Sequence, residues 1–154
     1  MAARTTGLSD YYRENGYVIV RGLVPTHYVD ALLDCYRRDM LASRNKFFRQ
    51  STDQYEANKL TASGFVRQSF LDIHAYEKYP RFREHALSIF FHQTMLDTLE
   101  QITGSQAHNL MQSMLFDANT ATPPHQDWWY LDSVPSGHLL AAWIALEDID
   151  ERAG

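Results

Sequence analysis

The 154-residue sequence has little of several features that define whole classes of protein. It contains a single cysteine, Cys35, so an internal disulfide is excluded and a reducing compartment is favoured. No apolar run approaches the roughly 20 residues that a membrane-spanning helix needs, and residues 1–6 lack the apolar core of a secretory signal. The expected location is therefore the cytoplasm.

Positive charge is also scarce. Fourteen Lys and Arg stand against nineteen Asp and Glu, which gives a formal net charge of -5. Nucleic-acid backbones are bound by clustered Lys and Arg, and the pair Arg37-Arg38 fits a solvated helix face better than such a cluster. We therefore expect neither nucleic acid nor a membrane as a partner. The apolar content of 45% and the length are ordinary for one globular domain.

The first hundred residues have mainly helical patterns. Ser9 or Asp10 is predicted to cap a short helix that ends at Gly16, and residues 17–21 have the β-branched density of a strand. Pro25 and Thr26 open a second helix, whose apolar residues recur at helical spacing. Its expected buried stripe consists of Val29, Leu32, Leu33, Tyr36 and Met40.

A polar segment separates this helix from a third one. Residues 44–64 show no clear period, which predicts a loop, either a lid that meets substrate or a plain surface loop. The third helix is predicted from Pro80 to Gly104, a favourable C-terminal stop. Its expected buried residues are Phe82, Ile89, Leu96 and Leu99.

The most informative stretch is His125-Gln126-Asp127. On an extended strand side chains alternate between faces, so His125 and Asp127 would point the same way. One imidazole and one carboxylate are two thirds of the 2-His-1-carboxylate facial triad of non-haem Fe(II) oxygenases. Taken alone, the tripeptide also fits a solvated turn or an incidental strand pair.

The neighbouring segments favour a sheet. Residues 109–117 (NLMQSMLFD) are predicted to form a strand before the His-x-Asp motif. Residues 139–148 (LLAAWIALED) are apolar on both faces, as a doubly buried strand should be, although a short helix has the same pattern. The motif would then lie between two strands.

With these residues in view, the sequence resembles the phytanoyl-CoA dioxygenase family of Fe(II)- and 2-oxoglutarate-dependent oxygenases. The resemblance rests on four blocks in the same order as in the family. They are residues 14–23 (ENGYVIVRGL), 96–104 (LDTLEQITG), 124–127 (PHQD) and 142–149 (AWIALEDI). Each block is weak by itself, but together they span nearly the whole chain.

The resemblance implies an α+β fold, in which N-terminal helices brace a double-stranded β-helix, also called a jelly-roll or cupin-like barrel. In the family, a distal metal-binding His and a basic residue that pairs with 2-oxoglutarate follow the last block. The only later His here is His138, which stands too near Asp127 in sequence to be that ligand. We therefore expect residues 1–154 to be the N-terminal part of a single dioxygenase domain, an incomplete barrel that is inactive alone and self-associates through exposed strand edges.

The resemblance also implies the chemistry of the parent enzyme. His125 and Asp127 would bind Fe(II), 2-oxoglutarate would chelate the iron as cosubstrate, and O2 would take the remaining site. The expected reaction oxidises a C–H bond of a small organic substrate and yields succinate and CO2. Because Asp127 supplies the carboxylate that related halogenases lack, hydroxylation is favoured over halogenation.

Further site residues follow from the same comparison. Gln112 stands where family members often place a polar contact to 2-oxoglutarate, and Trp143 aligns with an aromatic of the cosubstrate pocket, whereas Ala118 replaces a Lys that some members use. The alternatives are a strand amide satisfied by backbone for Gln112 and core packing for Trp143. The aromatic residues beside the metal motif would form a substrate wall or core packing: Trp128, Trp129 and Tyr130.

A different class of function is also consistent with the sequence. A His-Asp pair without a third ligand binds iron weakly, so a non-catalytic cupin-like binding or structural module is the alternative to the enzyme. No residue of the sequence identifies the substrate.

Overall fold

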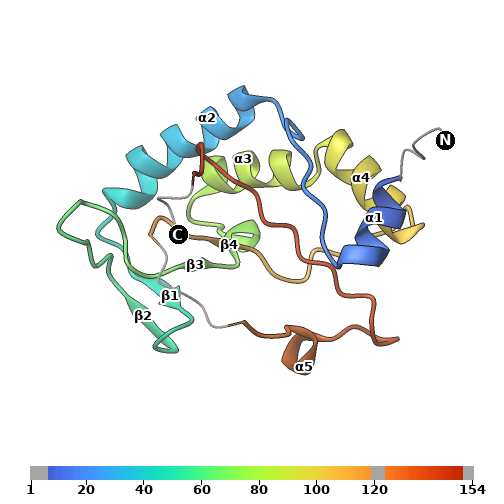
Figure 1. The fold of residues 1–154 in the computed structure, drawn as a ribbon. Helices are drawn as coiled ribbons and strands as arrows, with labels where there is room; N and C mark the ends of the chain where they lie inside the picture. Colours follow the sequence, from blue (N-terminus) through green and yellow to red (C-terminus); the bar gives the residue numbers. More distant parts are fainter. Residues whose placement is uncertain (1–6, 119–123, 151–154) are drawn as a thin grey trace. The chain divides into compact units, whose positions relative to one another are not determined.

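The computed structural model describes residues 7–118 and 124–150 (Figure 1). The chain divides into two compact units. Met1–Ala118 forms the first unit and Asn119–Gly154 the second. The first unit combines helices with two small antiparallel sheets, which confirms the α+β class. The described residues form no closed barrel, because each sheet has only two strands. None of their helices is long and apolar enough to cross a membrane.

Helix α1 spans Leu8–Asn15 and ends where the sequence indicated. Gly16 follows it at φ 76°, a left-handed conformation that glycine adopts without strain. The N-cap prediction was wrong, because Gly7 and neither Ser9 nor Asp10 occupies that position. The strand predicted at residues 17–21 was also wrong, since none of these residues pairs with a described strand. High β-propensity does not form a strand without a partner.

Helix α2 (Thr26–Cys35) continues into the π-helical turn η1 (Tyr36–Leu41). The predicted apolar stripe faces the core and packs against α3. Val29 and Leu33 are half-buried rather than fully buried. The buried residues of this helix are Leu32, Cys35, Tyr36 and Met40.

The helix predicted from Pro80 to Gly104 is two helices, α3 (Pro80–Phe90) and α4 (Gln93–Thr103). His92 interrupts the helical backbone and caps α4, its ring accepting a hydrogen bond from the Thr94 N–H. The break changes which side chains face inward. Phe82 and Ile89 are buried as expected, Leu96 and Leu99 are half-buried, and Met95 and Thr98 are buried in their place.

Each of the two sheets consists of one short antiparallel pair of strands. Strand β1 (Phe47–Arg49) pairs with β2 (Gln54–Glu56), so residues 44–64 are not the structureless loop that was predicted. Asp53 closes the turn at φ 54° and donates its N–H to the Arg49 carbonyl at 2.9 Å. Strand β3 (Phe70–Leu71) pairs with β4 (Met114–Leu115), so only two residues of the strand predicted at 109–117 form a strand.

Arg49 is fully buried at the centre of the first unit. Its guanidinium donates to the Ser69 carbonyl at 3.0 Å and to Asn58 Oδ1 at 2.6 Å, and it lies 4.5 Å from the ring centroid of Phe70. Burial lowers the pKa of Arg49, because a charged group is less stable away from water. The hydrogen bonds and the ring face offset this desolvation.

Asn58 extends this network to the helical layer. Its Nδ2 donates to the carbonyls of Met40 at 2.9 Å and Leu41 at 3.2 Å, where η1 ends. The Met40 carbonyl also accepts from the Ser43 N–H at 3.2 Å, so Asn58 adds a side-chain donor to the carbonyls at the end of η1. Arg49 and Asn58 therefore connect the hairpin, β3 and the end of η1.

We predict that Asn58→Ala lowers the free energy of unfolding by about 2–4 kcal/mol, since a hydrogen bond to a charged group is worth about 1.5–3 kcal/mol and the carbonyls of Met40 and Leu41 also lose a side-chain donor. Urea unfolding measures this change. Asn109→Ala, at an exposed position, is the control and should stay within about 0.5 kcal/mol of the parent chain. Equal effects of the two substitutions would contradict the role of the network.

Candidate functional site

The His-x-Asp motif brings its two side chains together. His125 Nε2 lies 3.2 Å from Asp127 Oδ1, and the side chains are 48% and 42% exposed. The backbone that does this is not the predicted strand. Asp127 has helical angles, φ -65° and ψ -32°, and helix α5 (Trp128–Leu131) begins directly after it. A chain turn at Asp127, rather than strand alternation, thus brings the carboxylate near the imidazole.

The pair has the spacing and chemistry that a metal centre needs. Two cis ligands that are each about 2.1 Å from one metal ion lie about 3 Å apart, close to the separation of this pair. A neutral imidazole nitrogen and a carboxylate oxygen are the donor types that non-haem Fe(II) prefers. The two residues therefore fit one edge of an octahedral iron site.

The described residues contain no group of three or more His, Cys, Asp or Glu side chains placed to hold a metal. His138 is exposed and donates its backbone N–H to Ser133 Oγ at 3.0 Å. It is not grouped with the pair. Within the part of the chain that the structure describes, the pair is a two-ligand site.

The aromatic residues after the motif lie on α5, not on a strand. The ring centroids of Trp128 and Trp129 are 5.3 Å apart at an interplanar angle of 40°. They are 52% and 74% exposed, so the core-packing alternative was wrong for both. The prediction for the Tyr130 side chain lies outside the described residues. Two apolar ring surfaces therefore stand exposed directly beside Asp127.

Trp143 is 74% exposed, and residues 139–148 pair with no described strand. The doubly buried strand predicted there was wrong. An apolar strand is stable only when partner strands satisfy its backbone groups, and the described part of the second unit supplies none. The structure thus does not place Trp143 in a pocket, nor in a packed core.

Gln112 belongs to the first unit, two residues before β4. It is half-buried, and its side-chain amide has no hydrogen bond to any residue in the ranges 7–118 and 124–150. Ala118 ends the same unit and supplies no polar group.

Sequence reasoning missed the contacts that hold the segment around Gln112. Ser113 is 7% exposed, and its hydroxyl lies 2.6 Å from His74 Nδ1. The His74 backbone N–H also donates to this hydroxyl, at 3.1 Å. The two residues are 39 positions apart, and no sequence pattern links them.

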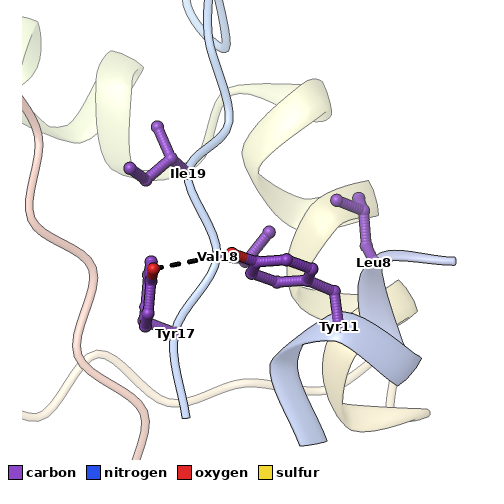
Figure 2. A pocket seen from close by; sticks show the side chains of 5 residues that line it. All are labelled: Leu8, Tyr11, Tyr17, Val18 and Ile19. Atoms are coloured by element: carbon purple, nitrogen blue, oxygen red, sulfur yellow. Dashed lines mark hydrogen bonds between the residues drawn. The ribbon is translucent and has the colours of Figure 1, made fainter. Parts of the chain in front are cut away.

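A shallow hollow of about 270 Å³ lies between α1 and the segment that follows it (Figure 2). The Tyr11 hydroxyl donates to the Tyr17 hydroxyl at 3.5 Å, which raises the pKa of Tyr11. The other lining residues, Leu8, Val18 and Ile19, are apolar. The hollow offers no metal ligand, so it is not a candidate catalytic site.

Comparison with known proteins gives one match. The family model described as phytanoyl-CoA dioxygenase (PhyH) matches residues 12–154, which includes the His-x-Asp motif and all four sequence blocks. No curated protein and no solved structure matches the chain.

We predict that Trp143→Ala changes the free energy of unfolding by no more than about 0.5 kcal/mol, because an exposed side chain loses few contacts. The same truncation at the fully buried Phe82 should cost about 3–5 kcal/mol. Chemical denaturation of the two variants gives the comparison. A cost at Trp143 that approaches the cost at Phe82 would show that this tryptophan is packed in a core.

Proposed function

Because the chain belongs to the phytanoyl-CoA dioxygenase family, we propose that it supplies the first two metal ligands of an Fe(II)- and 2-oxoglutarate-dependent dioxygenase. The proposed reaction hydroxylates a C–H bond of a small organic substrate. The observation that carries this proposal is the 3.2 Å approach of His125 Nε2 to Asp127 Oδ1. Family membership supports the reaction class.

In this proposal each residue has a limited task. His125 binds the metal through Nε2 in its neutral form, and Asp127 binds it as a carboxylate. Bound iron, together with 2-oxoglutarate and O2, supplies the oxidising power that no side chain of the chain possesses. The protein selects the metal, orients the cosubstrate and shields the reacting carbon from water.

The cosubstrate and substrate contacts are also proposed from the family. The side-chain amide of Gln112 would donate to a carboxylate of 2-oxoglutarate, and Trp143 would supply an aromatic contact to the cosubstrate. Trp128 and Trp129 would contact the substrate, since they expose adjacent apolar rings beside a metal ligand. Tyr130 is proposed as a third substrate contact on the basis of its position in the motif.

We predict that anaerobic Fe(II) quenches the tryptophan fluorescence of the chain, because Trp128 directly follows the ligand Asp127 and metal ions quench nearby indoles. His125→Ala and Asp127→Ala should each weaken Fe(II) binding by more than the roughly 10–100-fold that loss of an outer-shell partner costs. A fluorescence titration gives the affinities.

The matched controls for this titration are His138→Ala and Asp148→Ala, which remove an exposed imidazole and an exposed carboxylate from the same unit. Both should bind Fe(II) like the parent chain. If Asp127→Ala binds Fe(II) with unchanged affinity, the ligand assignment is wrong. If both motif variants retain full binding, neither residue is a metal ligand and the proposed Fe(II) site is overturned.

We predict that Gln112→Ala weakens 2-oxoglutarate binding in the presence of a bound divalent metal by roughly tenfold to hundredfold, since a hydrogen bond to a charged group is worth about 1.5–3 kcal/mol. Isothermal titration calorimetry measures this affinity. Gln101→Ala, which removes an exposed amide from α4, is the control and should have no effect. Unchanged affinity in Gln112→Ala would remove that residue from the cosubstrate site.

A further inference from the structure

Three hydrogen bonds connect Ser113 to Asp72 and His74. The Asp72 N–H donates to the Ser113 carbonyl at 2.6 Å, and the His74 N–H donates to Ser113 Oγ at 3.1 Å. The third contact joins Ser113 Oγ and His74 Nδ1 at 2.6 Å. Donors and acceptors thus converge on one residue from the short 3-10 helix η2 (Ile73–Ala75) and its N-cap.

The direction of the third bond follows from counting protons. The Ser113 hydroxyl is almost fully buried and has one hydrogen to donate. Its oxygen already accepts from the His74 backbone, and His74 Nδ1 is the acceptor within reach among the described residues. Donation to Nδ1 satisfies the buried hydroxyl and places the proton of the neutral ring on Nε2.

Asp72 has an uncommon backbone conformation, and this conformation supports the hydrogen bond to the Ser113 carbonyl. Asp72 has φ 53° and ψ 45°, the left-handed region that residues other than glycine occupy at an energetic cost. This conformation begins η2 and directs the Asp72 N–H to the Ser113 carbonyl. The contacts around Asp72 must offset the cost of this conformation. The same contacts hold the Ser113 carbonyl, which accepts from the Asp72 N–H.

These contacts also determine where Gln112 lies. Burial alternates along this segment, with Ser113 and Leu115 buried and Gln112 and Met114 half-buried. In an extended segment neighbouring side chains point to opposite faces, so Ser113 is held on the core side while Gln112 points away from it. Among residues 7–118 and 124–150, the Gln112 side-chain amide has no hydrogen-bond partner.

We propose that Ser113 and His74 are positioning residues that hold Gln112 for a carboxylate of 2-oxoglutarate. The pair does not touch the cosubstrate; it lowers the entropy cost of binding by keeping the Gln112 backbone in one place. This inference rests on the proposed function, because it assigns the ligand of Gln112 from that function. The contacts around Ser113 are independent of that assignment.

A double-mutant cycle tests the proposal in the Zn(II)-loaded chain, where Zn(II) replaces iron without redox chemistry. Ser113→Ala and His74→Ala should each weaken 2-oxoglutarate binding by about twofold to tenfold, the equivalent of one hydrogen bond. In the Gln112→Ala background neither change should weaken it further, because both act through Gln112. His74→Asn, whose side-chain oxygen can accept from Ser113, should restore the affinity to within about twofold.

Two further measurements separate positioning from general loss of structure. Hydrogen exchange of the His74 amide should become faster in Ser113→Ala without ligand, since its acceptor is removed. Zn(II) affinity should be the same in the parent chain and in every variant of this set. These results together would identify a local effect on the segment around Gln112.

Different results would overturn the positioning role of Ser113 and His74 and the proposed function. If Ser113→Ala weakens 2-oxoglutarate equally with and without Gln112, or leaves its binding unchanged, the positioning role is overturned. A chain that binds Zn(II) through His125 and Asp127 but binds no 2-oxoglutarate also overturns it, while the metal assignment stands. Loss of Zn(II) binding in the parent chain would overturn the proposed function itself.

Discussion

The buried guanidinium of Arg49 is the contact on which the first unit most depends. It carries a positive charge into the core with no carboxylate within ion-pair distance among residues 7–118 and 124–150. Neutral acceptors must therefore compensate, and they do so through Asn58 Oδ1 and the Gln68 and Ser69 carbonyls. The ring faces of Phe70 and Phe47 complete the enclosure. Such a charge is stable only while every one of these partners stays in place.

This arrangement connects the core to the segment around Gln112. The two carbonyls that accept from Arg49 directly precede β3, and β3 pairs with β4 through Phe70 and Leu115. The same side of the unit provides a second attachment, because the Val66 N–H donates to Asp117 Oδ2 at 2.6 Å. The segment from Gln112 to Asp117 is thus held at both ends by residues 66–74. Burial, together with the nearby Asp117 carboxylate, also raises the pKa of Tyr36, which keeps its phenol neutral.

Local sequence signals predicted the features that depend on local physics. The glycine stops at Gly16 and Gly104 and the apolar stripe of α2 were confirmed, because left-handed caps and helical periodicity involve residues within a few turns. The strands at 17–21 and 139–148 were not found, since pairing requires partners that propensity does not specify. The burial of Arg49 gave no sequence signal, because charged residues are normally exposed.

His125 and Asp127 lie close together as predicted, but the backbone conformation that brings them together differs from the predicted strand. The sequence predicted that His125 and Asp127 converge through strand alternation, and the structure brings them to 3.2 Å through a helical turn at Asp127. In both geometries residues two positions apart remain within reach of one ion. The proximity therefore tolerates a change of backbone conformation, which a contact such as that between Ser113 and His74 does not.

This difference separates the two parts of the proposed chemistry. The metal pair is built from neighbouring residues in the second unit, so its affinity for a metal depends on two side chains and a short backbone segment. In our proposal, the cosubstrate contact at Gln112 depends on Ser113, His74 and, further away, on Arg49. Substitutions in the first group should act on the metal, and substitutions in the second group on 2-oxoglutarate. A non-catalytic metal-binding module would need only the first group, so a dependence of 2-oxoglutarate binding on Gln112, Ser113 and His74 would favour an enzyme.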